Sequence, residues 1–461
     1  MQVREKRADW VAMALFISLV IIGWLMIYAA SYNEQESRSI FNLGSPAGKQ
    51  LLAIGIAAGL FLATQLIDWK FWNTLAYPLY GLGLISLVLV LIVGTSIKGS
   101  TSWFTIGRFS VQPSEFAKFF TCISLASFLA YYRTDLRRLK YQAGAVAMCL
   151  IPALLILKQP DAGSALVYGS FAILLFRSGM PSWIYIIGIA MAAIVIAALM
   201  FPPAMVIGIM ILIGAILTSI QTKQQWLWIA GITALIALES VLNISWLFLI
   251  VINTGVFVVC LLRRFRMRGG RQVLLLAPAL VLAAGLVYLS NYAFFKILEP
   301  HQQDRINVWL RPDQCDPRGS LYNVLQSKIA IGAGGLMGHG YLKGAMTNLN
   351  YVPEQTTDFI FSTIGEEQGF VGSAGIILLF TLLMLRVVAM AERMRSAFCK
   401  AYAYGFFGIL FVHVFVNIGM TMGLVPIIGI PLPFVSYGGS SLLAFTLMMG
   451  VLFKMDRSRY Q

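Results

Sequence analysis

Long runs of apolar residues, separated by short polar segments, set the pattern of this chain of 461 residues. The runs are about 17–25 residues long, which is the length that an α-helix needs to cross the hydrocarbon core of a bilayer. The pattern therefore predicts an all-α polytopic integral membrane protein with about fourteen transmembrane helices. The predicted spans are residues 11–30, 49–67, 75–94, 116–132, 142–157, 162–176, 183–201, 204–220, 226–242, 246–262, 273–297, 365–386, 401–422 and 434–453.

Composition agrees with this prediction, since 59% of the residues are hydrophobic and only 11% are charged, against roughly 25% charged in soluble proteins. No small-residue cleavage site follows the first apolar run, so we expect a retained span rather than a signal peptide.

The five cysteines are scattered and predict no disulfide framework, and the three histidines have no zinc-ligand spacing. The segment Gly44-Ser-Pro-Ala-Gly-Lys-Gln lacks the spacing of a P-loop, so no nucleotide cofactor is expected.

The formal net charge of +15 has a different meaning in a membrane protein from its meaning in a soluble one. If the N-terminus is cytoplasmic, most Lys and Arg residues fall in cytoplasmic segments, as the positive-inside rule requires. This topology predicts that both termini are cytoplasmic and that no nucleic-acid partner is needed to explain the basic residues.

One long polar segment, residues 299–364, interrupts the succession of spans and is predicted to be extracytoplasmic. Eight of the 19 acidic residues fall within 299–367. Loops of this length are usually functional or disordered, but this one holds too many apolar residues for disorder. We expect it to fold back onto the membrane surface and to carry part of a site.

The segment Gln112-Pro-Ser-Glu-Phe-Ala-Lys118 begins in a way that is typical of a helix start. Glu115 and Lys118 are then three residues apart on one helix face, close enough to pair. Ionisable residues within a span are costly and indicate function by default. The alternative is a structural ion pair; the polar loop before it, with Arg108, favours a functional cavity.

Two other polar turns are ambiguous on sequence alone. Asp161 follows a Gln-Pro turn, where it either caps the next helix or belongs to a site. The segment 431–441, with Ser436 and Ser440, opens the last predicted span. Its small residues either expose backbone N–H groups to an anion or allow close helix packing.

Asp358 is the candidate catalytic residue. Pro353 interrupts the chain, and Thr356 or Thr357 can cap a new helix, which would place Asp358 in its first turn. A carboxylate there is favoured by the helix dipole alone. At the membrane boundary, however, loss of water would raise its pKa and suit it to act as a general base.

Together these segments resemble the SEDS family (shape, elongation, division and sporulation). The resemblance covers most of the chain and rests on several long motifs in the same order. They are Gln112-Pro-Ser-Glu-Phe-Ala-Lys118, Gln159-Pro-Asp-Ala-Gly163, Gln326-Ser-Lys-Ile-Ala-Ile-Gly-Ala-Gly-Gly335, Pro353-Glu-Gln-Thr-Thr-Asp-Phe-Ile-Phe361, Glu366-Glu367 and Pro431-Leu-Pro-Phe-Val-Ser-Tyr-Gly-Gly-Ser-Ser441.

The resemblance implies a peptidoglycan glycosyltransferase of the bacterial cytoplasmic membrane. Such enzymes polymerise lipid II on the extracytoplasmic face, with a class B penicillin-binding protein as partner. The family's catalytic aspartate matches Asp358. The expected substrate-binding residues, several of which match polar residues of the family's central cavity, are Arg108, Glu115, Lys118, Asp161, Glu366, Ser436 and Ser440.

The sequence departs from the family in two ways. Family members usually have ten spans, so we predict a family core at 1–200 and 273–461, with transmembrane hairpins inserted at 201–272. The motif usually has His before Thr-Asp, where this chain has Thr356. The resemblance therefore does not carry a proton-relay role over to that neighbour, while the match at Asp358 stands.

The implied reaction is an inverting transfer from a polyprenyl-linked glycan strand to lipid II, for which one base, Asp358, is enough. The leaving diphosphate needs charge stabilisation. The sequence leaves open whether Arg108, Lys118, backbone N–H groups near 436–441 or a divalent cation, Mg²⁺ or Mn²⁺, supplies it. Two rival functions remain: a flippase for the lipid-linked precursor, and a non-catalytic scaffold for the penicillin-binding protein.

Overall fold

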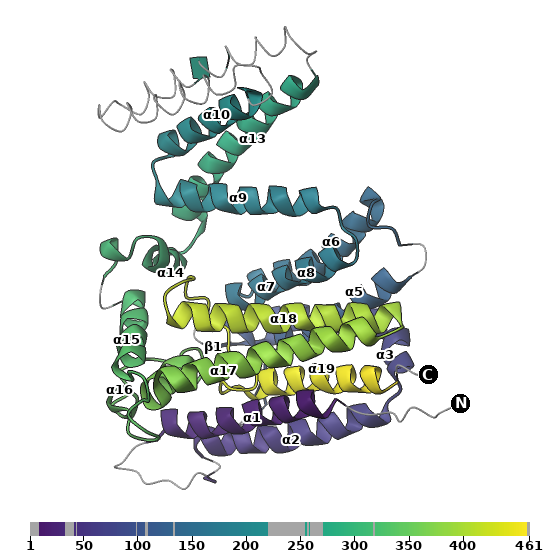
Figure 1. Ribbon diagram of the computed structural model, residues 1–461, viewed down its shortest axis with the longest axis vertical. Coiled ribbons are helices and arrows are strands. Elements are labelled where there is room, and N and C mark those ends of the chain that lie inside the picture. The colour runs from purple at the N-terminus through teal and green to yellow at the C-terminus, as the bar shows by residue number, and fades with distance from the viewer. Residues whose placement is uncertain are drawn as a thin grey trace. The chain divides into compact units, whose positions relative to one another are not determined.

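The computed structural model describes residues 9–32, 41–42, 44–97, 99–106, 109–131, 134–219, 254–255, 258, 271–316 and 319–458. The chain divides into two compact units (Figure 1). Unit 1 comprises residues 1–181 and 316–461, and unit 2 comprises residues 182–315. The candidate site residues all belong to unit 1.

Helices make up most of unit 1 (Figure 1). They are α1 (Trp10–Ala30), α2 (Pro46–Leu66), α3 (Trp69–Thr74), α4 (Ala76–Val93), α5 (Pro113–Ala130), α6 (Leu139–Leu157), α7 (Ala162–Val167), the 3₁₀ turn η2 (Tyr168–Ser170), α8 (Phe171–Arg177), α15 (Ser320–Ala333), α16 (Ala345–Asn348), α17 (Ile360–Arg393), α18 (Ala397–Thr421) and α19 (Gly439–Arg457). Unit 2 contains α9 (Ser182–Met200), α10 (Pro203–Ser219), α13 (Arg271–Tyr292), the π-helical η3 (Ala293–Ile297), α14 (Pro300–Leu310) and η4 (Pro312–Gln314).

Nine helices among the described residues are long and apolar enough to cross a membrane. Twelve of the predicted spans coincide with helices, counting α7 to α8 and α13 to η3 as one each. The predicted spans 226–242 and 246–262 lie outside the described residues, apart from 254, 255 and 258. The predicted span at 116–132 is α5, which is not among the nine. Helix α5 carries polar residues along its length, and packing against α4 and α18 buries them.

The structure shows regular elements in two of the polar segments between the predicted spans. The polar loop after α4 forms a three-stranded antiparallel sheet of β1 (Thr95–Ile97), β2 (Ser100–Ile106) and β3 (Phe109–Val111). The stretch from 299 to 359 contains the helices α14, α15 and α16. Helix α17 then begins at Ile360, inside the predicted loop.

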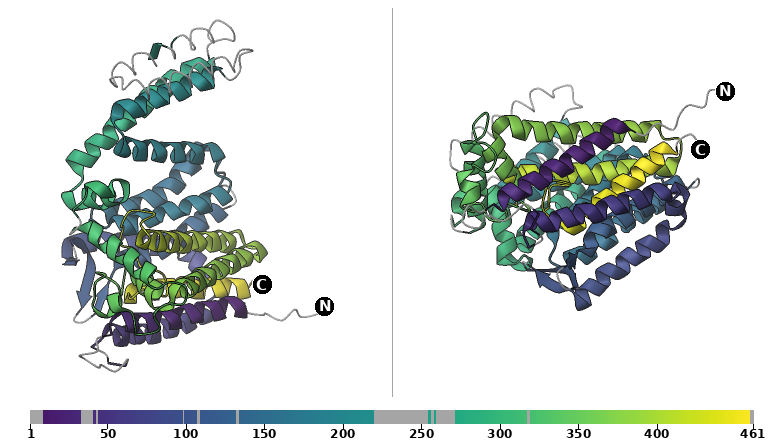
Figure 2. Two further views of the ribbon diagram at one scale, coloured as in Figure 1. Left: turned by 60° about the vertical axis from the view of Figure 1, so that its left-hand side comes forward. Right: turned by 90° about the horizontal axis from the view of Figure 1, so that it is seen from below.

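Helices α18 and α19 are the most buried of the nine candidate spans. Figures 1 and 2 show α1 and α2 side by side along one face of unit 1, next to α19. The indole Nε1 of Trp24 on α1 donates to the carbonyl of Ala47 on α2 at 3.1 Å. The core of unit 1 therefore lies along α18 and α19, with α5 on one side and α1 and α2 on another.

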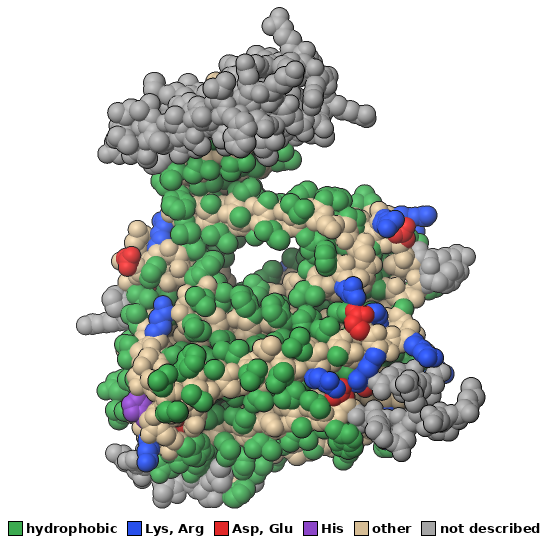
Figure 3. Space-filling model, in the orientation of Figure 1, with side chains coloured by type: hydrophobic (Ala, Val, Ile, Leu, Met, Phe, Trp, Pro, Cys, Tyr) green, Lys and Arg blue, Asp and Glu red, His purple; other side chains and the backbone are tan. Residues whose placement is uncertain are grey.

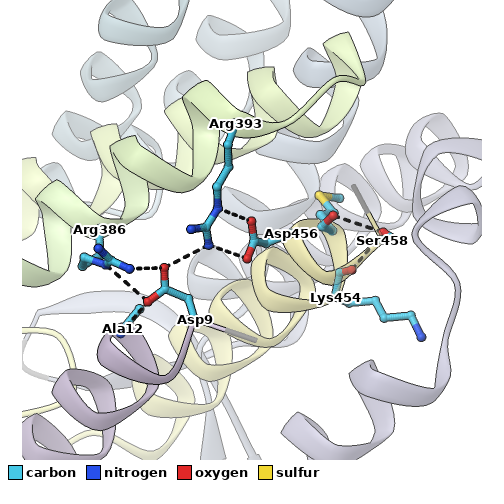
Figure 4. Close-up of polar contacts among 8 residues, drawn as sticks. Asp9, Ala12, Arg386, Arg393, Lys454, Asp456 and Ser458 are labelled. Atoms are coloured by element: carbon cyan, nitrogen blue, oxygen red, sulfur yellow. Dashed lines mark hydrogen bonds and ion pairs between the residues drawn. The ribbon is translucent and has the colours of Figure 1, made fainter. Parts of the chain in front are cut away.

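An ion-pair cluster fastens three helices at one end of unit 1, which we call the Asp9 end (Figure 4). Asp9 caps α1 by accepting from the N–H of Ala12 at 3.0 Å. Its carboxylate also accepts from Arg386 at 2.7 Å and from Arg393 at 2.9 Å, both on α17. Arg393 donates in addition to Asp456 on α19. On the face shown in Figure 3, Lys and Arg side chains gather at this end of unit 1.

Asp9→Asn is expected to lower the free energy of unfolding by about 2 kcal/mol. This is less than the 3–5 kcal/mol typical of a fully buried pair, because the two arginines remain 38% and 31% exposed and water screens them. Burial alone would raise the pKa of Asp9, but the N–H of Ala12 and the two guanidinium groups outweigh burial and lower it. The stabilisation is thus complete above the ordinary aspartate pKa, about 3.9, and is lost as the pH falls through the lowered value.

Thermal unfolding in detergent measures this effect. The matched control is Asp135→Asn, which breaks a pair with Arg138 whose side chains are 76% and 48% exposed. The control should leave the midpoint unchanged, since exposed pairs contribute little. Equal midpoints for Asp9→Asn and Asp135→Asn would show that the cluster does not hold the three helices together.

Candidate active site

Asp358 lies at the opposite end of α17 from the Asp9 cluster, in a turn that precedes the helix. Phe359 is the N-cap and the helix begins at Ile360, so Asp358 is not in the first helical turn and neither Thr356 nor Thr357 caps the helix. The N–H groups of Thr357 and Phe359 instead donate to the carbonyl of Glu354, which folds 354–359 into turns. Asp358 is half-buried.

The turn at 354–358 is held from two sides. Gln355, which is buried, donates from Nε2 to the carbonyls of Ala30, at the end of α1, and of Thr347, in α16. On the other side, the hydroxyl of Ser436 donates to the carbonyl of Thr357 at 2.6 Å. These contacts fix the backbone on which Asp358 stands.

The segment 430–438 is a non-helical loop that enters between the helices before α19. The last span was predicted to begin at 434, but α19 begins at Gly439. The reason lies in long-range bonds: Ser436 accepts from the N–H of Leu432 while its own hydroxyl bonds to the 354–358 turn. The N–H of Tyr437 donates to the carbonyl of Thr356 at 2.9 Å. Ser436 therefore joins two loops and is not part of a helix N-terminus.

Two residues of α18 complete the attachment of these loops, and sequence analysis missed both. Asn417 donates from Nδ2 to the carbonyls of Asp358 and Ile430, at 2.9 and 2.8 Å. His413, one turn earlier, faces the carbonyl of Pro431 with Nδ1 at 3.2 Å. Polar residues spaced by four within an apolar helix were the available signal, since they share one face.

Glu115 and Lys118 form the predicted ion pair, with Nζ 2.8 Å from Oε1. Both side chains are buried, Lys118 completely. Nζ also lies 3.0 Å from Nε2 of His413. Because an ammonium can only donate and a carbonyl can only accept, Nε2 of His413 accepts from Lys118 and Nδ1–H donates to Pro431. This arrangement requires a neutral imidazole, and it links α5, α18 and the 430–438 loop.

Asp161 is the N-cap of α7, accepting from the N–H of Ser164 at 3.0 Å, as the capping alternative predicted. Its other oxygen accepts from Nε2 of Gln112, the N-cap residue of α5, at 2.9 Å. The N–H of Gln112 donates in turn to the hydroxyl of Ser440, which donates to the carbonyl of Ser110. Asp161 and Ser440 thus come together through Gln112, at the start of α5.

Glu366 is buried in the first turns of α17. Its carboxylate accepts from the N–H groups of Met346 and Thr347 and from the hydroxyl of Thr347, at 2.7, 2.9 and 2.6 Å. The start of α16 thus supplies three hydrogen-bond donors to this carboxylate. Glu366 therefore supports α16, which in turn holds Gln355 of the Asp358 turn.

Three further predictions concern Arg108, a metal site and the cysteines. Arg108 is one of the undescribed residues. Within the described ranges, no three His, Cys, Asp or Glu side chains form a group able to hold a metal ion. Cys122, Cys149, Cys315 and Cys399 are free thiols, and Cys260 is not described.

The close approach of α1 to the 430–438 loop gives a testable consequence. A Cβ added at Gly23 would lie 2.5 Å from the carbonyl oxygen of Phe434 and from Cα of Val435. Gly23→Ala must therefore displace the loop, at a cost of about 1–3 kcal/mol by analogy with overpacked cores. The control is Gly55→Ala on α2, which meets nothing within 4 Å. A thermal unfolding midpoint as high for Gly23→Ala as for Gly55→Ala would contradict this packing.

The fold and this arrangement of loops define a family. The chain belongs to the family of cell cycle proteins FtsW, RodA and SpoVE, whose sequence profile matches residues 9–208 and 250–461. This is the SEDS family, so the resemblance seen in the motifs is confirmed. Within the family the chain is of the RodA type.

Individual comparisons agree. Peptidoglycan glycosyltransferase RodA of Treponema pallidum (strain Nichols) is 30% identical over 453 residues, 97% of each chain. A chain from a structure on the coordination of polymerization and crosslinking by a peptidoglycan synthase complex matches with a TM-score of 0.64 and 25% identity, covering 98% of this chain and 99% of that one. Rod shape determining protein RodA of Thermus thermophilus matches in fold with a TM-score of 0.56 and 24% identity, over 98% of both chains.

Proposed function

We propose that this protein is a peptidoglycan glycosyltransferase that polymerises lipid II during cell elongation. The observation that carries the proposal is the relation to the Treponema pallidum enzyme over 97% of each chain. The geometry supports it, because Asp358 stands on a turn that α1, α16, α18 and the 430–438 loop all hold in place. Fixed placement of a reacting group is what a transferase site requires.

In this mechanism Asp358 is the general base. The 4-hydroxyl oxygen of the GlcNAc of an incoming lipid II attacks C1 of the MurNAc that ends the lipid-linked strand. Asp358 takes the hydroxyl proton as the new C–O bond forms. The bond from C1 to the diphosphate oxygen breaks, and the polyprenyl diphosphate leaves with the electron pair. The α-linked donor becomes a β-linked glycoside, and Asp358 later releases its proton to water.

The leaving diphosphate needs compensating charge. The ammonium of Lys118 is committed to Glu115 and His413 and is fully buried, so we assign it to holding α5 against α18. The backbone N–H groups at the start of α19, beside Ser440, and the side chain of Arg108 are our candidates for diphosphate contact. A divalent cation, Mg²⁺ or Mn²⁺, held by the substrate diphosphate together with one or two carboxylates, is the further candidate, since the described residues contain no group of three metal ligands.

Topology follows from the same proposal. We place the Asp9 end of unit 1 in the cytoplasm, because arginines and lysines gather there, and the Asp358 end on the extracytoplasmic face. About fourteen spans keep both termini inside. The family profile does not match 209–249, which supports inserted transmembrane hairpins in the region 201–272. The partner is a class B penicillin-binding protein.

The test is polymerisation of labelled lipid II by the purified protein with its cognate penicillin-binding protein, whose transpeptidase is blocked by a β-lactam. A ladder of glycan strands is expected. A second reaction follows translocation of fluorescent lipid II across proteoliposomes. Translocation without strands would replace the proposal with the flippase function, and neither activity, with a bound and active partner, would leave a scaffold.

A further inference from the structure

Asn417 ties two distant segments to one point of α18. It is fully buried on α18, and its two amide hydrogens reach the backbone carbonyls of Asp358 and Ile430, at 2.9 and 2.8 Å. Both carbonyls belong to non-helical segments far apart in the sequence. A carboxamide is the neutral side chain that offers two hydrogens from one atom, so a single residue ties both segments to one point of α18.

The second segment is also the one that the carboxylate of Asp358 faces. Gly429 has φ +74°, and a Cβ added there would lie 3.2 Å from Oδ2 of Asp358. Asn417 therefore fixes the backbone of Asp358, which carries the carboxylate. It also fixes the backbone of Ile430, next to Gly429, against which the carboxylate lies. A change at Asn417 would alter the distance between the Asp358 turn and the 429–431 segment. The direction in which Oδ2 of Asp358 points would change with it.

The orientation of the amide is set by chemistry rather than by packing alone. Both neighbours of Nδ2 are carbonyl oxygens, which can only accept, so a flipped amide would place Oδ1 against two acceptors. His413 repeats the pattern one turn earlier, where it bonds the carbonyl of Pro431. The face of α18 that holds both residues thus bonds the backbone of 430–431 twice and that of Asp358 once.

We propose that Asn417 is a positioning residue, which sets the carboxylate of Asp358 relative to the 429–431 segment in the transferase site. This rests on the proposed function, and it assigns to α18 a role in the reaction that is separate from packing. Asn417 touches no reacting atom; its effect passes through the backbone of Asp358.

Asn417→Asp is the variant closest in shape, and because a carboxyl group has at most one O–H to donate, at least one of the two bonds to the carbonyls of Asp358 and Ile430 is lost. We expect kcat for strand synthesis to fall about 10²-fold, the loss that follows a misplacement of about 1 Å at a reacting group, with KM within about twofold of wild type. The acid limb of the kcat–pH profile should also move, because the surroundings of the Asp358 carboxylate change. Asn417→Ala, which removes the donors without adding a carboxylate, should behave in the same direction.

The matched control is Asn291→Asp. Asn291 on α13 also donates from Nδ2 to two carbonyls, those of Ala198 and Val287, at 3.1 and 3.0 Å, but it lies in unit 2. Loss of at least one donor there should lower thermal stability without moving the acid limb. If both Asn417 variants lose no more activity than Asn291→Asp, or lose activity with the acid limb unmoved, Asn417 is only a packing residue and the inference is overturned.

A second readout does not depend on strand synthesis. In a background with Cys260→Ser and Cys315→Ser, the thiol introduced by Asp358→Cys is labelled with a water-soluble maleimide, while the remaining three cysteines are buried. Adding Asn417→Ala should change the labelling rate at least about tenfold, and adding Asn291→Asp should not. An unchanged rate overturns the inference. If wild type makes no strands but the rate changes as expected, the proposed function fails and the positioning role stands.

Discussion

Replacing Lys118 with methionine is expected to lower the free energy of unfolding by about 3–5 kcal/mol, the usual result of leaving one charge of a buried pair without its partner. Nζ of Lys118 lies 2.8 Å from Oε1 of Glu115, and the two side chains are 0% and 2% exposed. Oε2 of Glu115 has no hydrogen-bond donor among the described residues. After the substitution, the buried Glu115 carboxylate would have lost its cation, and Oε2 would still have no hydrogen-bond donor.

The double variant Glu115→Leu with Lys118→Met separates charge from packing. Replacing a whole buried pair with apolar residues of similar size is often neutral or stabilising, so the double variant should recover most of the loss. Denaturation in detergent, followed by tryptophan fluorescence, measures all three proteins. A single variant within about 1 kcal/mol of wild type would mean that the pair does not contribute as its burial implies. A double variant as unstable as the single would assign the loss to packing.

Asp358→Asn is expected to reduce kcat by about 10²–10⁴, the range for loss of a general base. The amide has nearly the same shape, and the carbonyl that bonds Asn417 belongs to the backbone, so the thermal midpoint should hold within a few degrees. The measurement is the single-turnover rate of lipid II coupling at saturating substrate.

Asp161→Asn is the control for this prediction. It keeps an oxygen for the N–H of Ser164 and alters only the contact with Gln112. We expect less than about a tenfold change in rate, because asparagine is also a good N-cap. Equal losses for Asp358→Asn and Asp161→Asn would remove the special role of Asp358.

The helical spans could be predicted from sequence because they depend on local pattern. Apolar runs of spanning length identified α1, α2 and α4, and the Gln-Pro-Ser start together with the spacing of Glu115 and Lys118 placed α5 and its ion pair. These features depend on neighbours within four residues, which a sequence shows directly. Asp161 was correctly offered as a cap for the same reason.

The features that the sequence did not reveal depend on contacts between distant segments. Pro433 and Gly438 are local signs that 434–438 leaves the helix, but the bond that holds this loop, from Ser436 to Thr357, joins residues 79 positions apart. Asp358 was placed one turn too far into α17 for the same reason. Glu366 was predicted as a site residue, but the sequence did not show that its carboxylate accepts three hydrogen bonds from α16. His413 and Asn417 were visible as polar positions in an apolar run, but their partners were not.

The measurement that tests the central claim most directly is strand synthesis from radiolabelled lipid II by wild type and Asp358→Asn, each reconstituted with the same β-lactam-blocked partner and matched for folding and partner binding. Digestion with a muramidase identifies the product as a β-linked glycan. We predict muramidase-sensitive strands from wild type, formed about 10²–10⁴ times faster than from Asp358→Asn. Equal yields of strands from the two proteins would contradict the assignment of Asp358 as the base, and no strands from wild type would contradict the transferase itself.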